Sequence, residues 1–286
     1  MPRLQSASDQ SPEGPWTANA RGRAEPIESA VNISVCMATY NGEAYVARQV
    51  TSILEQLTPA DEIVVVDDCS TDRTVETIQR IGDPRISIHV NDRNRREVYS
   101  FSRAISLARN EIVFMADQDD VWMPGRATLM KQRLLASNAV VLSSNFQWMN
   151  ALEEPIDVPC DGVSAAHSAK HVRNVADIFI GKTNYFGCAM AFRREFVPVI
   201  APIPAFVESH DLWIALASNL ARSNIHLDAP TLLKRKHGSN ATSTVSTRSL
   251  YRKLRSRVIF ALSLVVLLTR VKSTPTRWRL PHADKR

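Results

Sequence analysis

The sequence predicts an α/β fold built around a mostly parallel sheet that is flanked by helices. Two observations support this fold: short apolar runs alternate with segments of helical periodicity, and acidic residues follow two of the runs. The strand-like runs cover residues 33–38, 62–66, 85–90 and 111–115, and the helical segments between them cover 46–57, 71–81 and 98–108. Alternation of strand and helix favours parallel pairing, because each helix can carry the chain back to the same edge of the sheet.

The second half of the chain has weaker patterns. Residues 139–142 have the pattern of a strand, and residues 211–221 that of an amphipathic helix. Residues 1–30 are rich in Pro, Ser, Gly and charge and lack an apolar core segment, so we expect a flexible leader and no signal peptide. We expect one domain over residues 31–245 and a basic, partly apolar tail over residues 246–286.

The composition excludes wholesale disorder and gives a basic balance. Of the 286 residues, 44% are hydrophobic and 22% are charged, and the net charge is +6. A basic balance suits nucleic acid, anionic lipid or an acidic small molecule as partner. The four cysteines form no C-x-x-C pair, which argues against a zinc site, and their mostly apolar surroundings indicate reduced core thiols of a cytosolic protein.

Acidic residues follow the second and fourth predicted strands. Asp67 and Asp68 end the second strand, and Asp117, Asp119 and Asp120 follow the fourth. Because ligands of open parallel sheets bind at the carboxyl ends of the strands, both groups should lie at the ligand-binding edge. Carboxylates this close repel one another unless a cation joins them, and oxygen ligands suit Mg²⁺ or Mn²⁺. Such a metal can hold a diphosphate and stabilise it as a leaving group.

The same aspartates could instead form turns and helix caps, as Asp often does. For Ser70, Thr71 and Asp72 this alternative has at least as much weight as ligand contact. For either acidic group alone the two interpretations are balanced. The occurrence of both groups at one edge of the sheet favours ligand binding.

Three motifs resemble those of the family 2 glycosyltransferases, which have the GT-A fold. They are VCMATYNGE at residues 35–43, VVDDCSTD at 65–72 and DQDDVW at 117–122, in the order and spacing of the family. The resemblance implies a nucleotide-sugar half over residues 31–122 and an acceptor half over residues 123–245. Glu43 and the DQDDVW variant are most similar to bacterial rhamnosyltransferases and other cell-surface polysaccharide enzymes.

The resemblance also implies roles for single side chains. Thr39 and Asp68 match residues that contact the base and ribose of the nucleotide, and Asp117 matches a further nucleotide-sugar contact. Asp119 matches a ligand of a divalent metal, Mg²⁺ or Mn²⁺. His237 matches a histidine in a closing loop that can reach the metal or the diphosphate. For His237, a surface or capping role is an equal alternative.

Two segments of the second half resemble the acceptor side of the family's site. Residues 187–192 match the segment that lines it, and residues 210–213 match the segment that carries the catalytic base. Asp211 is therefore expected to deprotonate the acceptor hydroxyl, and inversion then needs only one carboxylate. The alternative is that Asp211 caps the helix that follows. Glu208 is a second candidate for the base, and His210 is expected to shape the site.

Two positions depart from the family pattern. Many relatives have glycine where this chain has Arg96, which should alter the loop beside the donor. An aromatic residue is common before the arginine of the closing loop, where this chain has Lys234. Residues 234–236 are all basic, so with His237 they suit a lid that binds a diphosphate.

The C-terminal tail carries much of the basic excess. Cations stand on both sides of the apolar run 258–268, which is too short to span a bilayer. Such a run fits an interfacial helix on anionic lipid, and the alternative is a helix docked on the catalytic core. No aromatic-and-basic reader motif is present, so we expect no nucleic-acid partner. These features predict a cytoplasmic protein, peripheral on the inner face of the cytoplasmic membrane.

The predicted function is a metal-dependent, inverting transfer of a sugar from a nucleotide-diphosphate sugar to a saccharide or lipid-linked acceptor in cell-surface polysaccharide synthesis. One alternative is a nucleotidyltransferase on a related fold, which would need a Gly-rich basic loop where Asn41, Gly42 and Glu43 stand. The other is a receiver-like phosphoacceptor module. That module would use Asp67 and Asp68, but it also needs a lone Asp after its third strand and a later Lys at a strand end.

Overall fold

The computed structural model describes residues 31–160, 162–182, 185–236 and 250–274. The predicted leader over residues 1–30 and the candidate metal ligand His237 lie outside the described residues.

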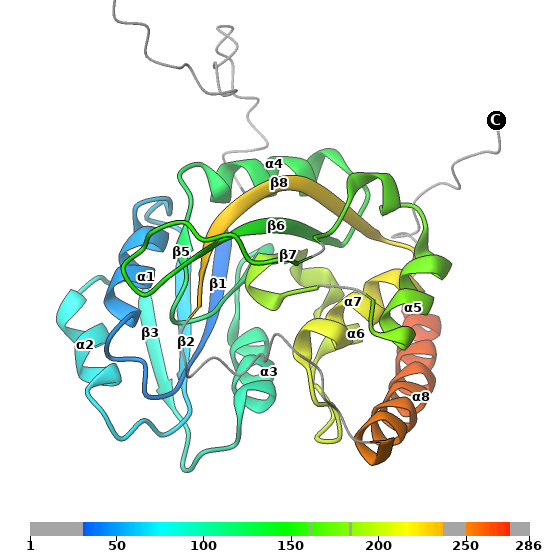
Figure 1. Ribbon diagram of the computed structural model, residues 1–286. Coiled ribbons are helices and arrows are strands. Elements are labelled where there is room, and N and C mark those ends of the chain that lie inside the picture. Colours follow the sequence, from blue (N-terminus) through cyan, green and yellow to red (C-terminus); the bar gives the residue numbers. More distant parts are fainter. Residues whose placement is uncertain (1–30, 161, 183–184, 237–249, 275–286) are drawn as a thin grey trace, which may run out of the picture. The chain divides into compact units, whose positions relative to one another are not determined.

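The first half forms four strands with three helices between them (Figure 1). The strands are β1 (Ile33–Thr39), β2 (Glu62–Asp67), β3 (Ile86–Val90) and β4 (Ile112–Ala116), and the helices are α1 (Val46–Leu54), α2 (Thr74–Ile81) and α3 (Glu97–Leu107). Every strand and helix predicted for this half is confirmed. The start of α2 at residue 71 is wrong, because Asp72 accepts a hydrogen bond from the N–H of Thr74 (2.9 Å) and residues 71–73 only lead into the helix.

The second half adds four strands, four helices and three short 3₁₀ turns. They are β5 (Val121–Trp122), α4 (Arg126–Ala136), β6 (Val141–Met149), η2 (Ala165–His167), α5 (His171–Ile180), η3 (Gly187–Ala189), β7 (Met190–Arg193), η4 (Arg194–Phe196), α6 (Val197–Ile200), α7 (His210–Leu220) and β8 (Asn224–Arg235). The strand predicted at residues 139–142 is β6, which runs further, and the helix predicted at 211–221 is α7. β8 was not predicted.

The eight strands form one sheet in the order β3-β2-β1-β4-β7-β6-β8-β5. The first four are parallel, as are β6 and β8, whereas β7 is antiparallel to both of its neighbours and β5 is antiparallel to β8. The mostly parallel sheet is therefore confirmed, with antiparallel strands in the second half. The pairing of Leu233 with Val121 brings the end of β8 beside the acidic loop that follows β4.

Alternate residues of the parallel strands face two different helical layers. Cys36 and Val64 pack in one layer with α3, α5, α7 and several residues of a C-terminal helix, whereas Val35 and Val65 pack with α1, α2 and α4. This two-residue alternation is what a strand buried on both faces requires. Both layers are visible on either side of the sheet in Figure 1. The predicted core setting of the thiols holds for Cys36 and Cys188, which are buried, but Cys160 is exposed.

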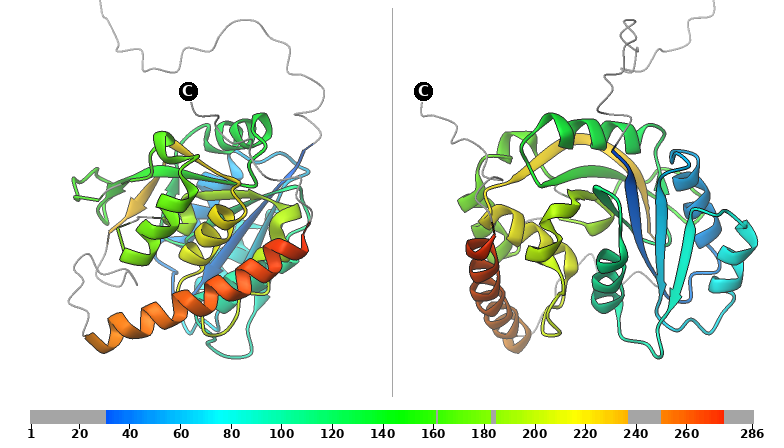
Figure 2. Two further views of the ribbon diagram at one scale, coloured as in Figure 1. Left: turned by 90° about the vertical axis from the view of Figure 1, so that its right-hand side faces the viewer. Right: turned by 180° about the vertical axis from the view of Figure 1, so that it is seen from behind.

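The C-terminal helix α8 (Leu250–Ser273) lies against α6 and α7, as Figure 2 shows from the side. Leu267 is fully buried, and Arg270 donates hydrogen bonds to the carbonyl oxygens of Val199 (3.1 Å) and Pro202 (2.9 Å). One face of the predicted tail is thus docked on the core. In the parts of the chain that the structure describes, no helix combines the length and apolarity needed to cross a membrane.

Candidate active site

The acidic group after β2 is held by the chain's own donors. The carboxylate of Asp67 is fully buried and accepts hydrogen bonds from the hydroxyl of Thr39 (2.8 Å) and from the N–H (2.8 Å) and hydroxyl (2.6 Å) of Ser70. These bonds join the end of β1 to the turn after β2. The hydroxyl of Thr39, a predicted nucleotide contact, therefore points at Asp67 and is buried.

Asp68 organises the loop between β3 and α3. Its Oδ1 accepts hydrogen bonds from the side-chain amide of Asn91 (2.7 Å) and the N–H of Arg95 (2.8 Å), and its Oδ2 accepts one from the N–H of Arg96 (2.7 Å). A carboxylate offers about four acceptor positions, so three are taken and about one is left for a ligand. The predicted nucleotide contact of Asp68 is compatible with this geometry. The contacts of Asp68 within the protein stabilise the loop between β3 and α3.

Arg96 has a backbone conformation that favours glycine. Its φ is 69° and its ψ is 163°, just before the first residue of α3. Residues other than glycine are strained in this region, at a cost of about 1–3 kcal/mol. The hydrogen bond from Arg96 to Asp68 is one interaction that holds the conformation in place.

Gln118 connects the acidic loop after β4 to the end of β1. Its side-chain oxygen accepts a hydrogen bond from the N–H of Tyr40 (2.9 Å), and its side-chain nitrogen donates to the carbonyl of Tyr40 (3.0 Å). A Cβ on Gly42 would overlap this side chain, so Gly42 leaves room for the connection. The acidic loop after β4 is thus held to the loop that follows β1.

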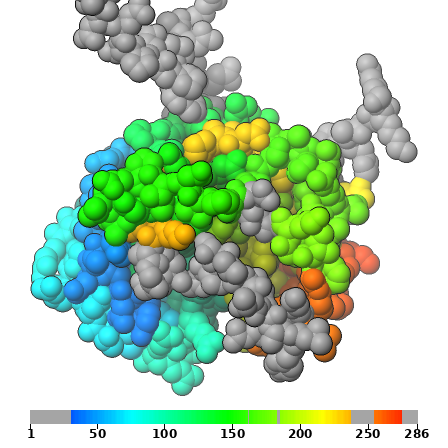
Figure 3. Space-filling model, viewed as in Figure 1, coloured from blue at the N-terminus to red at the C-terminus, as the bar shows by residue number. Residues whose placement is uncertain are grey.

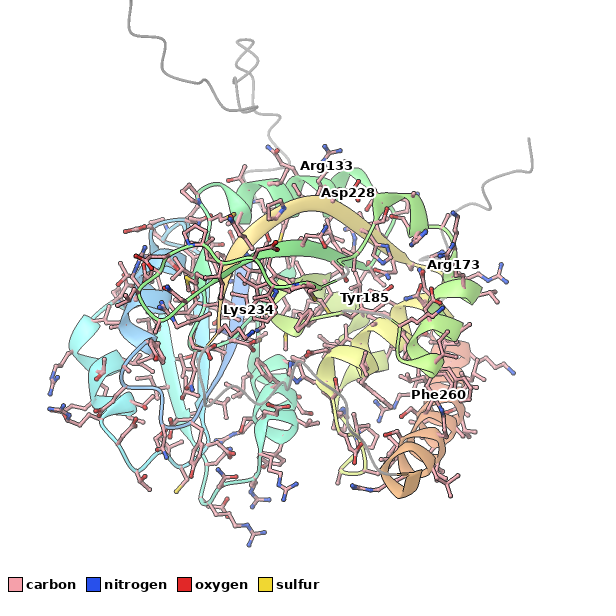
Figure 4. The ribbon with its side chains drawn as sticks, viewed as in Figure 1. Arg133, Arg173, Tyr185, Asp228, Lys234 and Phe260 are labelled. Atoms are coloured by element: carbon pink, nitrogen blue, oxygen red, sulfur yellow. The ribbon has the colours of Figure 1, made fainter. Side chains whose placement is uncertain are left out.

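The acidic group after β4 surrounds an ammonium from β8. Among the described residues, Asp117, Asp120 and Cys188 place one donor atom each within 4.8 Å of the others. The Nζ of Lys234 lies 2.9 Å from Asp117, 3.6 Å from Asp120 and 3.4 Å from the sulfur of Cys188. Lys234 is buried and is labelled in Figure 4. The cation that the sequence required for these carboxylates is therefore, in part, a side chain of the protein.

The protonation of this group follows from burial and from its charges. Although burial alone would act in the opposite direction, the pKa of Lys234 lies well above its ordinary value because Asp120 and Asp117 face it. Burial likewise opposes the shift at Asp117, where Lys234 lowers the pKa. Burial raises the pKa of Asp120 to about 7, aided by Asp119 and Asp117 and opposed by Lys234. Lys234 and Asp117 thus form a charged pair.

A divalent metal does not fit the inner donor set as it stands. The ammonium of Lys234 already occupies the neighbourhood of Asp117 and Asp120, so a metal there would have to displace it. Burial also raises the pKa of the Cys188 thiol well above its usual range, and a neutral thiol is a poor ligand for Mg²⁺ or Mn²⁺. Asp119, the predicted ligand, is half-buried and does not belong to this set.

Asp211 and His210 stand together at the start of α7. Nε2 of His210 lies 2.6 Å from Oδ1 of Asp211. A Cβ on Gly187 would come within 2.5 Å of that oxygen and 2.6 Å of that nitrogen, so glycine at this position leaves room for the two side chains. The side chain of Asp211 remains 23% accessible, whereas that of His210 is buried against the ring of Phe101. An acceptor hydroxyl can therefore reach Asp211 while His210 lies behind it.

His210 is favoured in its charged form. Burial alone would lower its pKa, but the pKa is raised because Asp211, Asp117 and Glu97 are close. Glu97 lies in the first turn of α3 and is exposed as a whole residue. Its pKa is nevertheless raised, because surrounding atoms desolvate its carboxyl and because Asp211 and Asp117 are close. The structure thus brings the predicted residues Asp117 and Asp211 into one electrostatic group.

A residue other than Asp211 occupies the N-cap position of α7, contrary to the alternative role considered for Asp211. The N-cap of α7 is Ser209, whose hydroxyl accepts a hydrogen bond from the N–H of Leu212 (3.2 Å). The second candidate base, Glu208, is paired with Arg255 of α8 (2.7 Å). Asp211 is therefore left for a role other than capping.

Sequence reasoning placed Lys234 in a lid and did not predict its position in the site. Lys234 and Arg235 are the buried last residues of β8, where Arg235 donates a hydrogen bond to the carbonyl of Ala151 (3.0 Å) and pairs with Glu153 (2.9 Å). Figure 3 shows the end of β8 beneath the loop that follows β6. The sequence feature that could have revealed this position is Lys234 itself, because an aromatic residue is common there in relatives. Glu97 was not predicted, because it stands in no acidic motif, and Cys188 was predicted only as part of the acceptor-lining segment 187–192.

Comparisons with known proteins agree with the resemblance found in the sequence motifs. The profile of a family described as Glycosyl transferase family 2 matches residues 34–198. The succinoglycan biosynthesis protein ExoO of Rhizobium meliloti is 33% identical over 119 residues, which is 42% of this chain and 34% of that protein.

Two further relatives carry names that describe a donor. The Escherichia coli protein WfgD, named as a UDP-Glc:alpha-D-GlcNAc-diphosphoundecaprenol beta-1,3-glucosyltransferase, is 25% identical over 118 residues, or 41% of this chain and 47% of that protein. The dTDP-rhamnosyl transferase RfbG of Shigella flexneri is 23% identical over 245 residues, or 76% and 78%. This chain spans less than half the length of ExoO and WfgD.

A solved structure confirms the predicted GT-A fold. TarS 1-349 of S. aureus in complex with UDP-GlcNAc has a TM-score of 0.62 to this chain at 18% identity, and the match covers 84% of this chain and 71% of that one. At this identity the likeness concerns the fold alone. The receiver-like alternative does not fit the fold, because the flavodoxin-like strand order is 2-1-3-4-5, whereas the parallel strands here have the order β3-β2-β1-β4.

Proposed function

Because this chain belongs to glycosyl transferase family 2, we propose that it transfers a sugar, with inversion, from a nucleotide-diphosphate sugar to a saccharide or lipid-linked acceptor. We place the reaction in the synthesis of a cell-surface polysaccharide. The family match favours this reaction over nucleotidyl transfer on a related fold.

One observation carries the proposal: a partly accessible carboxylate, Asp211, does not cap its helix and acts on the same His210 and Glu97 as Asp117, the partner of Lys234. Asp211 accepts the proton of the acceptor hydroxyl, and His210 lies behind it, with its Nε2 2.6 Å from Oδ1 of Asp211. The acceptor oxygen then attacks the sugar from the face opposite the diphosphate, which inverts the configuration.

The donor is held by the first half of the chain. Thr39 and Asp68 lie at the ends of β1 and β2, and Asp117 follows β4, so the three side chains share one edge of the sheet. Asp68 acts on the nucleotide both through its remaining acceptor position and through the loop that it shapes. Lys234 offers a fixed positive charge beside Asp117.

We assign the divalent metal, Mg²⁺ or Mn²⁺, to Asp119 and His237 and not to the inner donor set. When bound, such a metal stabilises the negative charge of the departing diphosphate.

The names of the relatives support the substrate classes. WfgD is named for a UDP-sugar donor and a diphosphoundecaprenol-linked acceptor, RfbG for a dTDP-rhamnose-type donor, and TarS was solved with UDP-GlcNAc. ExoO is named for the synthesis of a polysaccharide. A lipid-linked acceptor would place the protein at the inner face of the cytoplasmic membrane, where we propose that it acts as a peripheral protein.

A donor screen tests the proposal. The purified protein with Mn²⁺ is offered UDP-, dTDP- and GDP-sugars, and donor binding and hydrolysis are measured with wild type and Asp119→Ala. We expect one nucleotide class to bind, wild type to bind it more tightly with Mn²⁺, and Asp119→Ala to lose that gain and transfer. Equal donor affinity with and without Mn²⁺ in wild type would remove the metal from the mechanism. Binding of no nucleotide sugar would refute the proposed function.

A further inference from the structure

Helix α8 is apolar on two opposite faces, although docking on the core requires only one. The inner face carries Leu267, which is fully buried, and Phe260, whose ring meets that of Phe179 edge to face at 5.1 Å between centroids. The outer face carries five large apolar side chains that are 38–64% exposed: Leu254, Val258, Leu262, Val265 and Leu268. They recur every three or four residues, so they form one stripe along the helix.

The outer stripe is bordered by cations and by no acidic residue of its own helix. Arg255, Arg257 and Lys272 are exposed, and residues 250–274 contain no Asp or Glu. An apolar stripe with cations at its margins is complementary to a bilayer surface that carries anionic headgroups. It is a poor interface for a second copy of α8, because two such helices would bring like charges together.

The apolar surface continues from α8 onto α5. Val172, Phe179 and Ile180 are exposed on α5, with 40–76% of their surface accessible. The guanidinium of Arg257 lies 4.2 Å from the centre of the Phe179 ring and joins the margin of α8 to α5. The two neighbouring helices are seen at the same side of the domain in Figure 1, and Figure 4 labels Phe260 on α8. A surface made by two helices can rest on a membrane in a defined orientation.

Helix α8 is also attached directly to the helix that carries the candidate base. Arg255 pairs with Glu208, just before α7 (2.7 Å), and Arg270 lies over the ring of Trp213 in α7 (5.6 Å). His210 and Asp211 begin that same helix. Docking of α8 would therefore fix the distance of Asp211 from the membrane.

We propose that the outer stripe of α8, extended by α5, docks on an anionic bilayer surface and thereby holds the start of α7 toward a lipid-linked acceptor. The docking stands on the surface alone, whereas its use to present Asp211 rests on the proposed function. Contacts of the core with the inner face of α8 persist in the docked state.

The test is co-sedimentation of the full chain with vesicles. Phosphatidylcholine vesicles with and without about 30% phosphatidylglycerol are compared. The double variant Val258→Gln, Val265→Gln removes the middle of the stripe, and Leu107→Gln, an exposed apolar residue on α3, is the matched control. We expect wild type and the control to bind anionic vesicles, the double variant to bind at least about tenfold more weakly, and about 0.5 M NaCl to weaken wild-type binding.

Equal partition of wild type and the double variant onto anionic vesicles would overturn the proposal. A dimer of wild type that the double variant abolishes, without vesicle binding by either, would overturn it in favour of a second copy as partner. Because the changed side chains are exposed, folding should persist; a second pair, Leu254→Gln and Leu262→Gln, must reproduce the loss. Donor binding, measured separately without vesicles, reports failure of the proposed function independently of docking.

Discussion

The two acidic groups at the ligand-binding edge consist of the same residue type but are stabilised differently. Asp67 and Asp68 are held by N–H and O–H donors of the loops around them. Asp117 and Asp120 face the ammonium of Lys234, which comes from a strand more than a hundred residues away. The first group is satisfied by hydrogen bonds and builds the loops, whereas the second depends on a charge. From this difference we propose that the first group mainly shapes the donor site and that the second takes part in the chemistry.

The largest effect, on the rate of transfer, is expected at Asp211, which shares an electrostatic group with Asp117. Asp211→Asn keeps the shape but removes the proton acceptor, so transfer should fall by about 10²–10⁴-fold while donor affinity is kept. Because Ser209 caps α7, the melting temperature should stay close to that of wild type. Transfer rate, donor calorimetry and thermal melting are the measurements. Near-normal transfer would exclude Asp211 as the base, and Glu208 would be tested next.

Removal of the internal cation should be the next largest effect. Lys234→Met leaves Asp117 without its partner, and we expect the unfolding free energy to fall by about 2–4 kcal/mol. This loss is smaller than for a fully buried pair, because Asp117 retains some solvent contact. Denaturant titration measures the loss, with Lys236→Met, an exposed lysine two residues later, as control.

The same variant tests whether ammonium and metal compete. Without Lys234 the inner carboxylates should attract Mn²⁺, so Mn²⁺ should raise the melting temperature of Lys234→Met more than that of wild type. Equal shifts of the melting temperature in the two proteins would show that the ammonium does not compete with Mn²⁺ for this site.

The first group should respond to lost hydrogen bonds and not to lost charge. Asp68→Asn removes an acceptor from the donors in the loop before α3, with an expected cost of about 1–3 kcal/mol and a raised donor KM. Asp92→Asn, which weakens only the exposed ion pair with Arg95, should leave the stability close to that of wild type. A large fall in kcat with an unchanged KM in Asp68→Asn would contradict the proposed division of roles.

Arg96 allows the strain in the same loop to be measured. Arg96→Gly keeps the N–H that donates to Asp68 and removes the steric cost of the positive φ, so we expect a gain of about 1 kcal/mol. Arg95→Gly, at the neighbouring position, should destabilise the protein because it loses the pair with Asp92 without relieving a positive φ. Chemical denaturation of the two variants checks the signs. A loss of stability in Arg96→Gly would mean that the arginine side chain makes up for the strain.

The smallest effect expected is a dependence on pH. The pKa of His210 is raised above its ordinary 6.5, so its contribution to stability is fully present below 6.5 and is lost as the pH rises through the folded-state pKa. The stability difference between wild type and His210→Gln should therefore shrink from pH about 6 to about 8.5.

His171 supplies a control of opposite sign. Burial lowers the pKa of His171, so the difference between wild type and His171→Gln should grow as the pH rises. Chemical denaturation at several pH values gives both trends, and a His210 difference that grows with pH would show that its neighbours do not hold it charged.

The sequence by itself determined the parallel half of the fold and the edge where the site lies. The strands up to β4 and the helices between them are encoded by local periodicity, and the aspartates follow directly from the strand ends. Asp117 was predicted as a site residue from the acidic motif after the fourth strand, and Asp211 from a segment that resembles the family's catalytic-base segment.

Only the tertiary structure decided what those aspartates contact. The long strand β8 pairs with both β6 and β5, and this non-local pairing places Lys234 against Asp117. Local patterns cannot encode such a register, because it depends on which strands of a distant segment become neighbours. The cap at Ser209 and the two-faced packing of α8 were also decided by the fold, since a helix's periodicity shows that a face is apolar but not what covers it.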